Sequence, residues 1–208
     1  FDVDNLSTAT TMALKKKYLS SYKKWKILKQ GSVLDKKFCK SLGKFDIIYA
    51  WGVLHHTSNL WLSLKNIFLN SKKNTIFFVA LYNDEGFYSR VWLIIKKIYN
   101  ILYFDILKKI YFAFVLLFCT LKNYVFTIAN ITGSFKDLKI LFRTIKYYEK
   151  SRGMYYWNDQ LDWIGGYPFE VSKPEEIIKF FNNRKCKLLK IYVNHGYGNN
   201  IYIFKKEK

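Results

Sequence analysis

The sequence predicts an α/β fold in which strands and helices alternate and most strands run parallel. Two apolar runs, Phe45–Trp51 and 75–82, have the length and the β-branched and aromatic composition of strands, and a helical pattern at 60–69 separates them. A further helix and two alternating segments follow at 173–204. This alternation is typical of parallel βα units.

The first 44 residues fit the same pattern. Residues 1–4 resemble the end of a strand, and 8–18 have a helical pattern that ends in lysines. Residues 25–28 form a short apolar run, which a turn at 31–35 closes. The next run, Phe45–Trp51, is nearly continuous in its apolar character, so we expect a strand buried on both faces.

The middle of the chain differs from its flanks. Residues 88–149 have a mostly helical pattern, contain no proline, and are dense in aromatic, isoleucine and lysine residues. Within them, 110–121 is apolar apart from Thr120. A membrane-spanning helix needs about 20 such residues, so a buried or interfacial helix is favoured, and a transmembrane helix stays an alternative.

The last forty residues return to the α/β pattern. Lys173-Pro174-Glu175-Glu176 has the proline and acids of a helix start, and we expect this helix to reach about Phe181. Residues 187–193 and 200–204 alternate as strands, and 195–198 predict the turn of an antiparallel hairpin.

The 208-residue chain carries a formal charge of +20, which favours anionic partners. Only four of its 35 basic residues are arginine, however, and nucleic-acid readout favours arginine, so a nucleic-acid role is disfavoured. Two explanations of the charge stay open: amino acids with A/T-rich codons, or an anionic membrane surface as partner. Cys39, Cys119 and Cys186 are scattered, which suits a cytoplasmic protein, peripheral to a membrane in the second case.

The segment FDIIYAWGVLHHTSN at 45–59 ends a predicted strand in a glycine and two histidines. Ligands of open α/β sheets bind at the carboxyl ends of the strands, where a histidine can serve as a base or a hydrogen-bond partner. An ordinary loop is the alternative, and the spacing disfavours a metal site. His55 is our candidate base, and His56 the second.

In their order along the chain, several motifs resemble class I S-adenosylmethionine-dependent methyltransferases. FDVDNLST is similar to the end of the family's second strand, GSVLD to the loop after the third, and FDIIYAWGVLHHT to the fourth strand and its loop. ALYNDEG, RGMYYW, DWIGGYPFEV and KPEEI resemble the ubiquinone-biosynthesis-like subgroup. The resemblance implies a Rossmann-like core at 1–86, a helical insert or lid at 87–166, and a helix and hairpin at 167–208 that complete the core.

The resemblance also implies S-adenosylmethionine as cofactor and methyl transfer to a small or lipid-like acceptor. Asp2 would bind the ribose, and Ser32 and Val33 would flank the adenine, although an ordinary turn is the alternative for this pair. The remaining cofactor contacts would come from Trp51, Gly52, Val53 and His56. Substrate contacts would come from Tyr82, Asn83, Arg152, Tyr156, Trp157, Tyr167, Phe169 and Glu170. The aromatic members of this set would equally suit the core of a lid.

One departure from the family pattern affects the function. None of the ten glycines precedes residue 31, so the family's Gly-rich cofactor loop has no counterpart, and the resemblance begins inside the second strand. We therefore expect an N-terminally truncated sheet that needs the missing segment, in cis or in trans, for stability and cofactor binding. Two other functions stay open: a non-catalytic remnant, and a basic membrane- or nucleic-acid-associated interaction protein.

Overall fold

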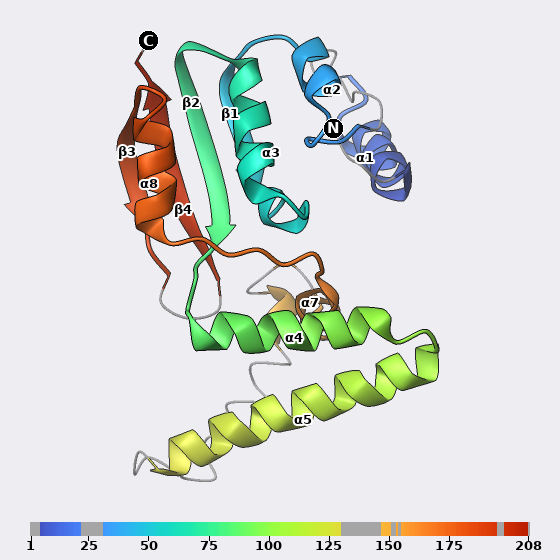
Figure 1. The fold of residues 1–208 in the computed structure, drawn as a ribbon. Coiled ribbons are helices and arrows are strands. Elements are labelled where there is room, and N and C mark those ends of the chain that lie inside the picture. Colours follow the sequence, from blue (N-terminus) through green and yellow to red (C-terminus); the bar gives the residue numbers. More distant parts are fainter. Residues whose placement is uncertain are drawn as a thin grey trace. The chain divides into compact units, whose positions relative to one another are not determined.

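The structure is a computed structural model that describes residues 5–21, 31–129, 147–150, 153, 155–194 and 198–207 (Figure 1). The predicted strands at 1–4 and 25–28, with Asp2 and Arg152, lie outside these residues. The chain forms two compact units, which we describe separately. Unit 1 comprises 1–85 and 170–208, and unit 2 comprises 86–169.

Unit 1 contains a four-stranded sheet in the order β1-β2-β4-β3 (Figure 1). Its strands are β1 (Phe45–Trp51), β2 (Ser71–Tyr82), β3 (Cys186–Tyr192) and β4 (Asn199–Lys206). The β1–β2 pair is parallel, and β4 is antiparallel to both β2 and β3. The predicted adjacency of the first two strands and the predicted antiparallel hairpin are therefore confirmed, and β4 alone of the four runs against the others.

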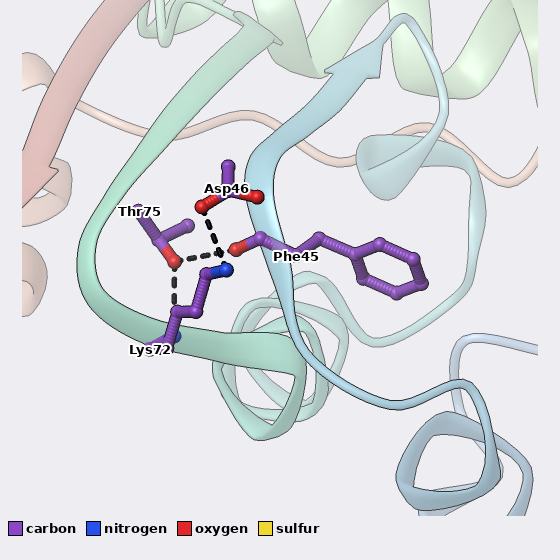
Figure 2. A network of polar contacts seen from close by, with 4 residues as sticks. All are labelled: Phe45, Asp46, Lys72 and Thr75. Atoms are coloured by element: carbon purple, nitrogen blue, oxygen red, sulfur yellow. Dashed lines mark hydrogen bonds and ion pairs between the residues drawn. The ribbon is translucent and has the colours of Figure 1, made fainter.

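The amino ends of β1 and β2 are joined by the polar contacts in Figure 2. Thr75 is fully buried, and its Oγ1 donates to the carbonyl of Phe45 at 2.6 Å and accepts from the backbone nitrogen of Lys72 at 2.9 Å. The exposed ion pair between Lys72 and Asp46 adds little, because water screens it. These contacts fix the irregular register here, which explains why β2 begins four residues before the predicted strand.

One face of the sheet is covered by the helices α3 (Leu60–Ile67) and α8 (Pro174–Asn182) (Figure 1). Both helices were predicted, although α3 gives way to a 3-10 turn at Phe68–Asn70. Their apolar sides pack on alternate sheet residues, which point to the same face. Aromatic rings dominate this core, and the Phe181 and Phe204 rings stack 4.0 Å apart. Its other buried members include Ala50, Leu64, Phe77, Val79, Ile177 and Tyr202.

The opposite face of β1 is open, so the prediction that this strand is buried on both faces is wrong. Ile47 is 66% exposed, Tyr49 65% and Trp51 45%. The Tyr49 and Trp51 rings stack on Phe78 of β2, at 5.3 and 5.9 Å between ring centres. An apolar run indicates a strand but does not show whether both of its faces are covered. Here the helices of the described residues cover only one face.

Two further helices of unit 1 precede β1. The predicted helix near the start is α1 (Asn5–Tyr18). A short helix that we had not predicted, α2 (Lys36–Ser41), follows the 31–35 turn. Asp35 caps α2, because its Oδ1 accepts from the backbone nitrogens of Lys37 and Phe38.

Unit 2 is helical, as the sequence predicted for 88–149 where that stretch is described. It contains α4 (Phe87–Ile101), α5 (Asp105–Ala129) and α7 (Tyr156–Gly165). The Tyr111 hydroxyl of α5 donates to the carbonyl of Ile95 in α4 at 3.2 Å. In the described part of the chain, no helix has both the length and the apolar character needed to span a membrane.

Within unit 2, α4 packs on α7 around a buried lysine. The Lys96 amine is fully buried and donates to the carbonyl of Trp163. It lies 4.3 Å from the centre of the Trp163 ring and 5.0 Å from that of Phe169. Desolvation in these apolar surroundings lowers the pKa of Lys96 to about 7.

Candidate functional site

The carboxyl end of β1 turns sharply at Gly52. Its φ of +68° is a left-handed value that favours glycine, and open space lies where a Cβ would point. Its backbone nitrogen donates to the carbonyl of Ala80 at 3.4 Å, which ties the turn to β2. The flanking Trp51 and Val53 are both exposed. These features fit the close approach of a ligand to the backbone, as predicted for residues 51–53.

The turn leads directly into the two histidines, which lie in a 3-10 helix, Leu54–His56. His55 is fully buried, and its Nδ1 accepts a hydrogen bond from the backbone nitrogen of Tyr82 at 3.3 Å. The His55 and Tyr82 rings stack 3.9 Å apart, and the half-buried His56 meets both rings edge-on. The carboxyl ends of two adjacent parallel strands are thus joined through His55.

This hydrogen bond constrains what His55 can do chemically. Because Nδ1 accepts, the proton of the neutral imidazole is on Nε2. In this tautomer Nε2 is a donor. Before Nε2 can accept a proton, the ring proton must move to Nδ1, which ends the hydrogen bond with Tyr82. His56 is partly exposed and is therefore the more accessible of the two imidazoles. The role of His55 as base stays a prediction.

The segment 170–172 closes the site from the far end of the chain. The Glu170 nitrogen donates to the carbonyl of His55 at 3.0 Å, and the Ser172 nitrogen donates to that of Tyr82 at 3.1 Å. The Glu170 carboxylate accepts from the backbone nitrogen of Leu60 at 3.1 Å, at the start of α3. Glu170 was predicted to contact substrate, and the structure gives it a contact with a helix start.

Sequence reasoning missed Ser172, which pairs with Asn83 in an isolated parallel bridge. Its side chain is buried, and its Oγ has no hydrogen-bond partner among the residues that the structure describes; the same is true of the second carboxylate oxygen of Glu170. No local pattern could have indicated the contacts of Ser172 and Glu170, because their partners lie about 90 to 110 residues away in the sequence. Asn83 Nδ2 donates to Glu85 at 2.7 Å.

The turn at 31–35 has the contacts of an ordinary turn. The Ser32 hydroxyl accepts from the backbone nitrogen of Leu34 at 3.1 Å. The Val33 side chain is buried in the core, and its carbonyl accepts from Asn66 Nδ2 at 2.8 Å. This arrangement favours the alternative stated above, and the adenine contacts of Ser32 and Val33 stay predictions.

The remaining predicted substrate residues belong to unit 2. Trp157 and Tyr167 are exposed, Tyr156 is half-buried, and Phe169 is buried beside Lys96. The environment of Phe169 is that of a core residue, which was the alternative for the aromatic set. Among the described residues, no cluster of histidine, cysteine and acidic side chains could hold a metal ion.

Comparison with known proteins supports the fold. No family model and no curated protein matches the sequence. A solved structure of PKMT2 from Rickettsia typhi in complex with AdoHcy superposes with a TM-score of 0.54 and 17% identity. The match covers 98% of this chain and 43% of that chain, so this chain spans less than half of that protein's length. The chain thus has the Rossmann-like sheet of a methyltransferase fold.

Proposed function

We propose that this chain forms part of a site for S-adenosylmethionine-dependent methyl transfer. The observation that carries the proposal is the joining of two adjacent parallel strands at their carboxyl ends, through Gly52, His55 and Tyr82. This edge is where open α/β sheets bind ligands. A similar fold bound to AdoHcy, the product left after S-adenosylmethionine gives up its methyl group, supports the choice of cofactor.

The described residues fit one side of such a site. Open space beside Gly52 leaves its backbone accessible, and the exposed Trp51 and Val53 offer apolar surface next to it. The Ser32 hydroxyl accepts from the backbone nitrogen of Leu34, and the Val33 side chain lies in the core, so the contacts of this turn stay predictions. We therefore place the cofactor contacts of this chain at 51–53.

When bound, S-adenosylmethionine supplies an already activated methyl group, so the task of the protein is orientation and proton removal. We propose that His55 holds the β1 and β2 ends in register and presents its Nε2 proton as a donor. His56, being partly exposed, would accept the proton of an oxygen or nitrogen nucleophile. The base is still a histidine, but the hydrogen bond of His55 with Tyr82 favours His56 over His55 for this role.

We further propose a small or lipid-like acceptor, as in the ubiquinone-biosynthesis-like subgroup. The motifs of that subgroup, including WGVLHH and GGYPFE, support this finer assignment.

Calorimetric titration with AdoHcy tests the proposal, with Gly52→Ala as the diagnostic variant. Gly43, with a φ of +86° and equally open surroundings, provides a matched control in the turn before β1. Each substitution should cost roughly 1–2 kcal/mol of stability through left-handed strain. We expect only Gly52→Ala to weaken AdoHcy binding, by about tenfold or more. Equal affinities of the two variants would refute a cofactor contact at Gly52.

A further inference from the structure

The turn that joins α4 to α5 carries a dense set of exposed apolar side chains, which we call the hairpin tip. Its members are Ile98, Ile101, Tyr103, Phe104, Ile106, Leu107 and Ile110, and each of them is exposed. Unit 2 folds in a way that leaves them outside: α5 directs Tyr111 toward α4 and buries Val115. The tip is therefore apolar surface that the packing of α4 on α5 does not use.

The apolar surface continues along both helices. Ile94, Ile98 and Ile101 follow each other at helical spacing on α4, and Ile106, Ile110, Phe114 and Leu117 do so on α5. At 1.5 Å per residue, the α5 stripe extends about 17 Å. Contiguous exposed apolar surface of this kind marks an interaction site.

Positive charge borders this surface. At 100° per residue, Lys97 lies beside the α4 stripe and Lys109 beside the α5 stripe, and both are exposed. Asp105 is the one acid in the 17 residues from Ile94 to Ile110. Lysine amines beside apolar side chains, with aromatic rings at the turn, are typical of segments that bind at a lipid surface.

The exposure and the charge of the hairpin tip favour a lipid surface over other binding partners. Tyr103 is 87% exposed and Ile101 79%, so both side chains protrude from the tip. A second copy would bring Lys97 and Lys109 close to the same lysines and add another charge of +20. A fluid anionic bilayer instead accepts protruding apolar side chains and pairs with the lysines.

We propose that the hairpin tip inserts into the surface of an anionic membrane, with Tyr103 and Phe104 at the apolar–polar boundary and Lys97 and Lys109 on lipid headgroups. This inference does not depend on the proposed methyl transfer. The hairpin tip would attach to one leaflet, and neither α4 nor α5 would span the membrane.

Flotation of the 208-residue chain tests the proposal. It compares vesicles of phosphatidylcholine alone with vesicles that also contain about 30% phosphatidylserine. We expect binding to the anionic vesicles and a loss of about tenfold or more in the double variant Tyr103→Ser, Phe104→Ser. The matched control Tyr155→Ser, Leu189→Ser removes two other exposed apolar side chains and should bind as the parent does. The tip variant keeps every charge, so its loss would not be electrostatic.

A second pair of variants tests the charges. Lys97→Glu with Lys109→Glu should weaken binding to anionic vesicles by about tenfold or more, and more than the same change at the exposed Lys37 and Lys187. Parent-like flotation of the tip variant would overturn the proposal, as would equal losses in the two charge-reversal pairs. A concentration-dependent dimer of the parent that the tip variant abolishes, without vesicle binding, would instead assign the tip to a second copy.

Discussion

His55 and Tyr82 join the ends of two parallel strands by a hydrogen bond from the Tyr82 backbone nitrogen to His55 Nδ1, with the two rings stacked 3.9 Å apart. A buried imidazole in this position has a structural role whatever its chemical role. It satisfies a backbone donor at the edge of the sheet where the candidate site lies.

His55→Ala should therefore reduce both stability and turnover. Loss of the acceptor leaves the Tyr82 N–H without this partner, which should lower the free energy of unfolding by about 1–3 kcal/mol. Turnover of the active enzyme should fall about 10²-fold or more, with little change in cofactor affinity. Urea unfolding and steady-state kinetics measure the two effects. Unchanged turnover would remove His55 from the mechanism.

The variant His55→Asn separates the two roles. Its amide oxygen can replace Nδ1 as the acceptor for Tyr82, but the variant lacks Nε2 and cannot act as a base. On the proposed assignment, in which His55 holds the strand ends, Asn should restore stability and the part of the turnover that depends on this contact, and His56→Ala should also lose about 10²-fold because it removes the base. A stable but inactive His55→Asn enzyme would show that the reaction needs His55 Nε2 and that positioning alone is not the role of this residue.

Glu170 should stabilise the core through α3. Glu170→Ala removes the acceptor of the Leu60 nitrogen at the helix start, and we expect a loss of about 0.5–2 kcal/mol in the free energy of unfolding. Glu170→Gln keeps an oxygen and should lose less, because only the attraction of the charge to the helix dipole disappears. The exposed Glu175 provides the control, since Glu175→Ala removes an acid from the first turn of α8. Equal stability of Glu170→Ala and the parent would contradict this role.

Lys96 should make the stability of unit 2 depend on pH. Burial lowers its pKa from 10.5 to about 7, so the unfolded chain binds more protons than the folded chain between these pH values. Its contribution to stability therefore increases as pH rises through this window, with a slope of up to about 1.4 kcal/mol per pH unit, and is constant below about pH 7.

The comparison of Lys96→Met with the parent isolates this effect. The variant should be the more stable of the two at pH 7, and the difference should shrink by pH 9. Thermal unfolding at both pH values measures it, with the exposed Lys97→Met as control. Parallel pH profiles for Lys96→Met and the parent would show that the folded state retains an ordinary lysine.

The sequence by itself determined much of the local structure. Apolar and β-branched character predicted β1 and β2, the Pro-Glu-Glu signal predicted α8, and period-two alternation predicted the β3–β4 hairpin. These signals are local, because strand and helix periodicity depend on residues a few positions apart. The same locality placed Gly52 and the two histidines at a strand end.

Only the tertiary structure decided which faces and side chains are covered. The exposed Tyr49 and the buried Lys96 both contradict what their residue types suggest, because exposure depends on elements distant in the sequence. The contact of Glu170 with Leu60 spans 110 positions and has no local signal. Hydrophobic burial is non-directional, so a sequence shows which residues would gain free energy from burial. The packing of whole helices on a sheet decides which of these residues are buried.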